Sequence, residues 1–218
     1  MKKSKPRISI VSPCWGRPAR TRRMINNILG QTINNWEAFI IGDGCPHFQD
    51  MVESHEVEYF KKTAEEKGNI LHCYNLDKNH GGFGKYIIDH AIANAIGEYF
   101  IFVANDDIIL PNHFEHYLSE IEGTNLDLVY YNTFVGPTNS VRNSILKGGQ
   151  IGHSECIFRT DFIRDIPHGD DYGQDWRFIQ YLIGKEGSQY KKAKSEYCSY
   201  IVGHIHHFGK DYTIDKMD

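Results

Sequence analysis

The chain has 218 residues, a length typical of one domain, and 40% of them are hydrophobic, which is enough for a substantial core. Its formal net charge of −4 excludes the strongly basic composition expected of a protein that binds nucleic acid or an anionic membrane surface. The cysteines are odd in number, and no two form a C-x-x-C pair, which argues against a disulfide framework or a zinc knuckle and favours reduced thiols: Cys14, Cys45, Cys73, Cys156 and Cys198.

We expect no targeting signal in the first residues of this sequence. The basic segment 1–7 leads directly into the apolar segment 8–11, which is far too short for a signal peptide or a membrane span. We therefore expect a cytoplasmic protein, either free or held peripherally at a membrane by a partner. No repeat and no low-complexity linker interrupts the chain, so we expect a single domain over residues 1–218.

Strand-like and helix-like segments alternate through the first half of the chain. Within 20–31, for example, apolar residues recur at the spacing of one helix face. Such alternation predicts an α/β fold with a mostly parallel central sheet and helices on both faces. The expected strands are 8–11, 36–41, 70–74, 99–103, 126–135, 157–159 and 196–202; the expected helices are 20–31, 47–67, one opened by 81–84, one with Pro111 in its first turn, and 174–183.

Polar or functional residues follow three of the expected strands. These segments are 13–17, 43–44 and 105–107. In a parallel sheet the carboxyl ends of the strands meet at one edge, where ligands bind in open α/β folds. We therefore expect the three segments to gather at one site.

Two adjacent carboxylates, Asp106 and Asp107, come where a fully apolar strand leaves the core. Buried carboxylates need a cation, hydrogen bonds or water. Mg²⁺-like ions are often held by one or two carboxylates together with substrate phosphates. The alternative is a polar turn with an Asp helix cap ahead of Pro111.

Short motifs follow one another along most of the chain, from about residue 8 to about residue 208. They are ISIVSPCWGR at 8–17, Gln31-Thr32, Trp36-Glu37, Asp43-Gly44, Gly81-Gly82, Ala95-Ile-Gly-Glu-Tyr99, Asp106-Asp107 and Gln174-Asp175. Their order and spacing resemble those of family 2 glycosyltransferases, which are inverting enzymes with the GT-A fold, the fold of nucleotide-diphospho-sugar transferases.

This resemblance implies transfer of a sugar from a nucleotide-diphospho-sugar, with UDP as the default nucleotide, to an acceptor hydroxyl with the help of Mn²⁺ or Mg²⁺. It implies a nucleotide-binding part over about 1–107 and an acceptor-binding part over about 108–218. The residues implied for the nucleotide-sugar are Pro13, Trp15, Arg17, Asp43, Asn105 and Asp106; those implied for the metal are Asp106 and Asp107; the catalytic base is Asp175.

Further residues are weaker candidates. Lys85, after the Gly-rich turn, is a candidate contact for phosphate or base. Glu155 and the neighbouring His153 are candidates for the acceptor because they precede the strand 157–159. Trp176 either stacks on the acceptor or belongs to the core.

Two clusters of basic residues remain open in meaning. His204 and His206 share one face if their segment is extended, and imidazole beside Asp106 would favour Mn²⁺, but a surface turn is the alternative. The arginines at 20, 22 and 23 oppose the helix dipole at the start of the first helix, which a bound anion would relieve. We expect them to form a solvated face or a partner patch.

Two positions depart from the family pattern. The usual Asp-x-Asp has Ala104 in its first place, and the usual Glu before the base is Gln174. Without the resemblance, Asp175 would be an ordinary first-turn residue of an apolar-faced helix.

Two other functions are compatible with this architecture. A nucleotidyltransferase would carry a Gly-rich loop with Arg and Lys directly after the first strand, whereas 13–17 is poor in glycine. A non-catalytic nucleotide-sugar-binding module would tolerate Ala104. The donor sugar, its base, the acceptor (a glycan, a lipid carrier or another hydroxyl compound) and the oligomeric state are not specified by these residues.

Overall fold

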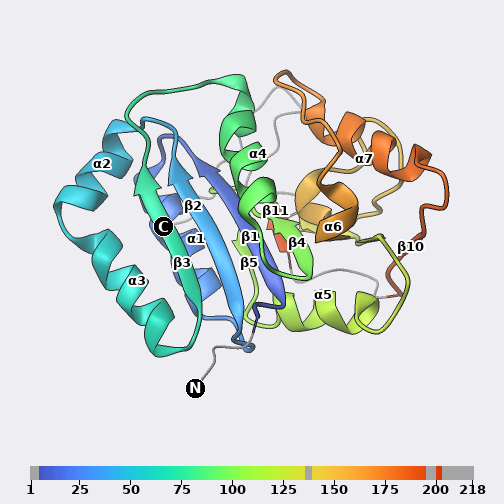
Figure 1. Ribbon diagram of the computed structural model, residues 1–218, viewed down its shortest axis with the longest axis horizontal. Coiled ribbons are helices and arrows are strands. Elements are labelled where there is room, and N and C mark those ends of the chain that lie inside the picture. The colour runs from blue at the N-terminus through green and yellow to red at the C-terminus, as the bar shows by residue number, and fades with distance from the viewer. Residues whose placement is uncertain (1–4, 136–138, 195–199, 203–218) are drawn as a thin grey trace.

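The computed structural model describes residues 5–135, 139–194 and 200–202 (Figure 1). A large sheet with the strand order β10-β6-β9-β4-β1-β2-β3 forms its centre, and a small sheet has the order β5-β11-β7-β8. The strands of the large sheet are β1 (Ile8–Cys14), β2 (Trp36–Gly42), β3 (Ile70–Asn75), β4 (Tyr99–Phe102), β6 (Leu128–Tyr130), β9 (Cys156–Arg159) and β10 (Tyr190–Lys192). Those of the small sheet are β5 (Ile108–Ile109), β7 (Thr133–Val135), β8 (Ser140–Arg142) and β11 (Tyr200–Val202).

The large sheet is mostly parallel, as expected. β1 pairs in parallel with both β2 and β4, and β2 pairs in parallel with β3, while β9 runs antiparallel to its neighbours β4 and β6. The carboxyl ends of β1, β2 and β4 therefore meet at one edge of the sheet. This confirms the α/β architecture with a mostly parallel central sheet.

Helices cover both faces of this sheet (Figure 1). One apolar cluster includes Ile10 of β1 with Met24 and Phe114 from helices on the first face, and a second includes Val11 with Phe178 on the other. Adjacent strand residues thus point to opposite faces, as the pleat requires. The helices of the first face are α1 (Pro18–Leu29), α2 (Pro46–Glu53), α3 (Glu56–Glu66) and α5 (His113–Ile121); those of the second are α4 (Lys85–Asn94), α6 (Thr160–Ile163) and α7 (Gln174–Gly184).

The first strand continues further than expected. β1 runs through Ser12 and Pro13 to Cys14, whereas we expected it to end at residue 11. Its pairing with β4 ends at Val11, so Pro13 is paired only with β2. The missing N–H of Pro13 therefore removes no ladder bond on the β4 side.

The other expected boundaries need three corrections. The helix 47–67 is two helices, because His55 adopts the left-handed conformation with φ 62° between α2 and α3. The strand 126–135 is β6 and β7 in different sheets, and the buried Tyr131 between them stacks on Tyr117 at 4.1 Å. Pro111 precedes α5, whose N-cap is Asn112, and so lies outside its first turn.

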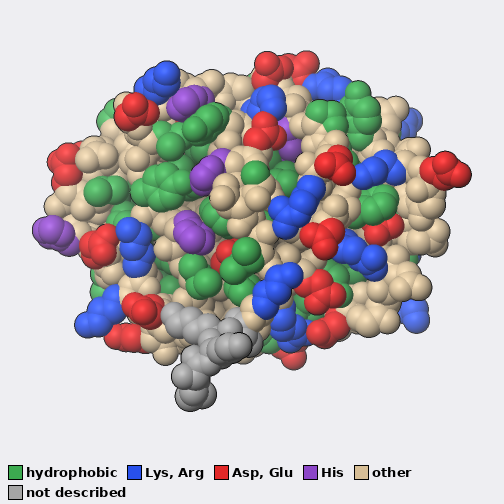
Figure 2. All heavy atoms as spheres, viewed as in Figure 1, with side chains coloured by type: hydrophobic (Ala, Val, Ile, Leu, Met, Phe, Trp, Pro, Cys, Tyr) green, Lys and Arg blue, Asp and Glu red, His purple; other side chains and the backbone are tan. Residues whose placement is uncertain are grey.

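Three further observations concern the residues that the structure describes. Cys14, Cys45, Cys73 and Cys156, the cysteines in the described ranges, are all free thiols. Within those ranges, no helix combines the length and the apolar content that a bilayer crossing requires. On the face that carries β3 and α4, acidic and basic side chains are interspersed (Figure 2).

Candidate active site

The three segments expected at one edge of the sheet do meet there. The backbone N–H of Asp43, just after β2, donates to the carbonyl of Cys14 at 3.1 Å. Arg17, three residues after β1, forms an ion pair with Asp106, which follows β4. The ends of these parallel strands therefore bring residues from distant parts of the sequence into one group.

Asp106 lies at the centre of this group and is surrounded by arginines of α1. The residue is only 3% exposed. Besides the ion pair with Arg17, its Oδ2 lies 3.8 Å from Nη1 of the buried Arg20. Arg23 donates to the backbone carbonyl of Asp106 at 3.1 Å. The interpretation of Arg20 and Arg23 as a solvated face or partner patch is thus wrong, because both are turned inward to the acidic segment.

Arg22 behaves differently from its neighbours. It pairs with Glu56 of α3 through two hydrogen bonds of 2.5 and 2.7 Å, away from Asp106. Arg17 is held in the left-handed conformation, with φ 50°, at the N-cap of α1 and is 41% exposed in its side chain. Of the three arginines beside Asp106, Arg17 is therefore exposed, Arg23 is partly buried and Arg20 is buried.

The neighbours of Asp106 are also buried. Asp107 is 4% exposed, and Asn105 donates its side-chain N–H to Thr21 of α1 at 3.2 Å. The N–H of Asp107 bonds to the carbonyl of Ala104 at 3.2 Å, which makes this segment a tight turn. Asn105, Asp106 and Asp107 thus form one buried polar turn at the sheet edge.

Asp106 and Asp107 can supply only part of the ligand set of a divalent cation. In the described ranges, no three His, Cys, Asp or Glu side chains are grouped closely enough to hold a metal ion by themselves. Two adjacent carboxylates, Asp106 and Asp107, suit an ion that takes its other ligands from a diphosphate and water. His204 and His206, the expected tail ligands, lie outside the described residues.

Asp43 has partners within the protein. Its carboxylate accepts hydrogen bonds from the N–H groups of His80 at 2.9 Å and Gly81 at 3.2 Å, and from the Asn79 side chain at 3.1 Å. These bonds fix the beginning of the Gly-rich turn. The structure therefore gives Asp43 a framework role, and its contact with the nucleotide stays a prediction.

The Gly-rich turn has an unusual backbone. Four consecutive residues, Gly81, Gly82, Phe83 and Gly84, have positive φ, with 51° at Phe83. A Cβ on Gly84 would lie 2.5 Å from the Cβ of Pro13, so only glycine allows the turn to pack against the end of β1. Phe83 itself is 64% exposed.

The same turn contacts the other wall of the site. Gln174, the first residue of α7, donates its side-chain N–H to the carbonyl of Phe83 at 3.3 Å. The Gly-rich turn thus joins the carboxyl end of β1, at Pro13, to the N-terminus of α7, where Asp175 is the second residue.

Asp175 is partly open to solvent, in contrast to Asp106. Its side chain is 45% exposed, and both of its oxygens contact His153. His153 belongs to a short 3-10 helix, η3 (His153–Glu155). Trp176, which follows Asp175 in α7, is half-buried, packs on the second apolar cluster and lies against Gly148. Trp15, which directly follows β1, is 54% exposed.

Glu155, expected to face the acceptor, is 1% exposed. Its carboxylate accepts hydrogen bonds from Thr133, from Arg142, from Ser144 at 3.0 Å and from the backbone N–H of Gly152 at 2.5 Å. These partners come from β7, from β8 and from the segments on either side of 145–151. The side chain holds this part of the fold together, and an acceptor role for it stays a prediction.

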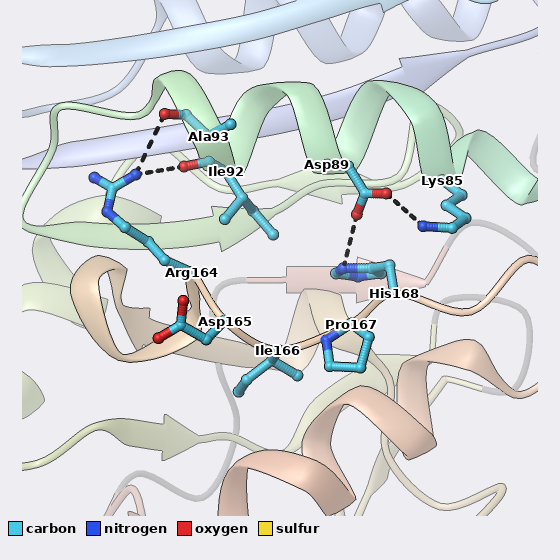
Figure 3. Close-up of a pocket in the computed structure, with 9 residues that line it drawn as sticks. All are labelled: Lys85, Asp89, Ile92, Ala93, Arg164, Asp165, Ile166, Pro167 and His168. Carbon is cyan, nitrogen blue, oxygen red and sulfur yellow. Dashed lines mark hydrogen bonds and ion pairs between the residues drawn. The ribbon is translucent and has the colours of Figure 1, made fainter.

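Lys85 contacts an acid of its own helix. It pairs with Asp89 one helical turn along α4, beside a hollow of about 280 Å³ (Figure 3). His168 lines the same hollow, and Arg164 caps the carboxyl end of α4 by donating to Ile92 and Ala95 at 2.7 Å. A contact of Lys85 with phosphate or base stays a prediction.

Comparison with known proteins identifies the family. The family described as "Glycosyl transferase family 2" matches residues 9–182, which is most of the chain. The chain belongs to glycosyl transferase family 2. A protein of Rickettsia typhi named "Uncharacterized glycosyltransferase RT0329" is 30% identical over 127 residues, covering 58% of this chain and 36% of the relative. The chain thus spans about a third of the length of that relative.

Solved structures show the same fold. TarS 1-349 of S. aureus in complex with UDP matches with a TM-score of 0.70 and 15% identity, over 90% of this chain and 60% of that one. A mannosyltransferase of Pyrobaculum calidifontis, PcManGT, in complex with GDP-Man and Mn²⁺ matches with a TM-score of 0.69 and 14% identity, over 94% and 59%. These likenesses confirm the GT-A fold expected from the sequence.

Sequence reasoning missed the inward role of Arg20 and Arg23 and the contact between His153 and Asp175. The arginines did give a signal, because cations at a helix N-terminus are unfavourable unless an anion is near. Nothing in the local sequence around His153 pointed to a residue 22 positions away.

Proposed function

We propose that this chain transfers a sugar from a nucleotide-diphospho-sugar, with UDP as the nucleotide, to an acceptor hydroxyl with inversion at the sugar carbon and with a divalent cation. One observation carries the proposal: a carboxylate surrounded by arginines, Asp106, and a solvent-exposed carboxylate, Asp175, stand on two walls that a single Gly-rich turn connects. Membership of glycosyl transferase family 2 supports the reaction class.

The donor binds at the edge of the sheet in this proposal. Arg17 turns its exposed guanidinium from Asp106 to the diphosphate, and Asp106 and Asp107 are the residues that would hold the Mn²⁺ or Mg²⁺ ion. The metal ion supplies Lewis-acid stabilisation of the leaving diphosphate. Pro13, Trp15 and Asp43 line the nucleotide, and UDP in the TarS complex supports the choice of base.

The acceptor binds on the side of α7. Its hydroxyl oxygen attacks the anomeric carbon from the face opposite the diphosphate. As that bond forms, the bond from the anomeric carbon to the β-phosphate oxygen breaks, and nucleoside diphosphate leaves. Asp175 takes the hydroxyl proton as general base, which contributes about 10²–10⁴-fold to the rate. No enzyme nucleophile takes part.

Both halves act as one unit in this proposal. Strands β1 to β4 of the nucleotide-binding part, about 1–107, share the large sheet with β6, β9 and β10 of the acceptor-binding part, about 108–218. A continuous sheet keeps the two walls at a constant distance, which supports a single catalytic domain.

The test is a panel of nucleotide-sugars with Mn²⁺, an acceptor library and a measurement of the released nucleotide. We expect nucleoside diphosphate release that depends on acceptor and falls about 10²–10⁴-fold in Asp175→Asn. Asp161→Asn is the matched control, because Asp161 is an exposed acid in the first turn of α6. Product NMR that showed retained anomeric configuration would contradict the inverting mechanism.

The two competing functions give different results. Release of pyrophosphate would indicate a nucleotidyltransferase. Tight binding of a nucleotide-sugar without turnover, unchanged by Asp175→Asn, would indicate a binding module, which Ala104 in the place of the usual first acid keeps open.

A further inference from the structure

His153 lies under the exposed carboxylate of Asp175 and is almost completely buried. The residue is 4% exposed. Its ring stacks on Phe102 of β4 at 4.2 Å between centroids and meets the edge of Phe178 of α7 at 5.0 Å. Aromatic rings on two sides therefore fix the plane of the imidazole.

His153 contacts both oxygens of Asp175. Its backbone N–H donates to Oδ2 at 3.2 Å, and its ring Nδ1 lies 3.2 Å from Oδ1. Gly152 allows this close approach, because a Cβ on it would lie 3.2 Å from the same Oδ2. His153 thus contacts the carboxylate of Asp175 at two points.

The protonation state of His153 follows from its surroundings. Burial lowers the pKa of the imidazole below its usual value, and the Asp175 carboxylate opposes only part of this shift. A neutral imidazole carries one N–H, and the nitrogen that faces a carboxylate is the one that carries it. Nδ1–H is therefore the ring donor that faces Oδ1 of Asp175, at 3.2 Å between the heavy atoms, while Nε2 has no hydrogen-bond partner among the described residues.

We infer that His153 is the positioning residue of the base: its backbone N–H and Nδ1–H orient the Asp175 carboxylate so that the exposed side meets the acceptor hydroxyl. This inference rests on the proposed function. His153 keeps its own proton throughout, and the proton of the acceptor hydroxyl goes to Asp175 and from there to solvent. The effect is on orientation, since a misplacement of about 1 Å at a reacting group costs about 10²-fold in rate.

A second histidine in the same cluster offers a comparison. The ring of His168 lies 5.0 Å from that of His153 and 4.2 Å from that of Phe178. It is as buried as His153, but the acid that its ring faces is Asp89 of α4, at 3.8 Å beside the hollow of Figure 3. Substitution of His168 therefore perturbs the same apolar packing without touching Asp175.

The experiment compares four variants in the acceptor-dependent transfer assay. His153→Phe keeps the aromatic packing and removes the Nδ1 donor. His153→Asn places an amide N–H near the position of Nδ1, and His153→Gln places it near Nε2. We expect kcat to fall about 10²-fold in the Phe variant and similarly in the Gln variant, with the donor KM unchanged, and to recover by about tenfold in the Asn variant. His168→Phe should stay within about twofold of the wild type.

A double-mutant cycle separates positioning from packing. Because His153 acts only through Asp175, His153→Phe should cost no further activity in the Asp175→Asn background. Equal losses in the Phe, Gln and Asn variants, matched by His168→Phe, would overturn the inference and indicate a packing role. Each variant is first checked for a native unfolding midpoint.

The outcome also distinguishes this inference from the proposed function. If Asp175→Asn retains full transfer, the proposed function itself fails. If Asp175→Asn abolishes transfer but His153→Phe does not, the general base stands and only the positioning role of His153 is lost.

Discussion

Asp106 and Asp175 stand on opposite walls of the proposed site in opposite surroundings. Asp106 is buried at the end of β4 and faces the cationic side chains of Arg17 and Arg20. Asp175 is half-exposed at the start of α7, and its contact is the neutral ring of His153. The same side chain is thus placed once among charges and once beside a neutral donor and solvent.

This difference indicates that the two carboxylates have different roles in the proposed reaction. A carboxylate held among guanidinium groups belongs to a region that balances charge, such as the one a diphosphate and a cation bring. A carboxylate with an open side and a fixed orientation is suited to receive a proton from a hydroxyl. The comparison therefore predicts that substitutions on the two walls affect different steps of the same reaction.

The largest effect that tests this difference between the two carboxylates is expected at Asp106. We expect Asp106→Asn to lower kcat/KM for the donor by about 10²–10³-fold, because a charge that organises the diphosphate is lost. Calorimetry of UDP binding with Mn²⁺ should show weaker binding in this variant and unchanged binding in Asp175→Asn. Asp161→Asn again serves as control. Full activity of Asp106→Ala would show that the metal assignment is wrong.

The second prediction asks whether Glu155 belongs to the acceptor wall or to the framework. Glu155→Gln should lower the free energy of unfolding by about 3 kcal/mol, because it leaves Arg142 and three further donors of a buried carboxylate poorly matched. Urea unfolding measures this effect. Glu115→Gln, which alters an exposed hydrogen bond to Thr32, should change stability by less than about 1 kcal/mol. A stable Glu155→Gln with a raised acceptor KM would instead favour the acceptor role.

The third prediction concerns the absence of charge on the wall that carries His153 and His168. Burial lowers the pKa of His168 far below its usual value, so the native state binds no proton there while the unfolded chain does so below about pH 6.5. The contribution of neutral His168 to the free energy of unfolding is therefore present above pH 6.5 and is lost as the pH falls. Between pH 7.5 and 5.5 the loss is about 1.4 kcal/mol for one such histidine.

His168→Phe should remove that part of the pH dependence. The difference in unfolding free energy between pH 7.5 and 5.5 should be about 1.4 kcal/mol smaller in the variant than in the wild type. Urea titrations at the two pH values test this. An unchanged difference would mean that His168 takes up a proton in the native state, and that this wall is not neutral.

The sequence predicted the mostly parallel sheet, and it predicted that three polar segments meet at one edge of it, for physical reasons. Apolar runs such as 38–41 in β2 and 99–102 in β4 require burial on both faces, and the residues that follow them must then lie at the edge. The order of the motifs also predicted the family. Some of these motifs prove to be structural: Glu37 accepts hydrogen bonds from Ser9 and from the N–H groups of Ile96 and Gly97.

The remaining features depend on contacts between distant segments. The partners of Asp43 at 79–81 and those of Glu155 at 133–152 become visible only when loops are folded against each other. The split of 126–135 into β6 and β7 likewise follows from the packing of Tyr131 on α5. No local pattern encodes such contacts, so these side chains were expected at substrates although the structure gives them partners in the protein.

The smallest predicted effect lies at Phe83, in the turn that joins the two walls. A non-glycine residue in the left-handed region costs about 1–2 kcal/mol, and Phe83 is flanked by glycines that adopt positive φ freely. Its ring is 64% exposed, so little packing offsets this cost. Phe83→Gly should therefore raise the free energy of unfolding by about 1 kcal/mol, as measured by urea unfolding. Phe83→Ala, which keeps the Cβ in the same conformation, is the matched control and should bring no such gain. The activity of Phe83→Gly shows what the strained backbone is for. If the variant is more stable but loses transfer activity while Asp106 and Asp175 are intact, the ring of Phe83 contacts the substrate, because backbone strain of this kind persists where function requires it. If Phe83→Gly is less stable, the ring packs in the turn, and the link between the two walls is an apolar contact in addition to the hydrogen bond from Gln174.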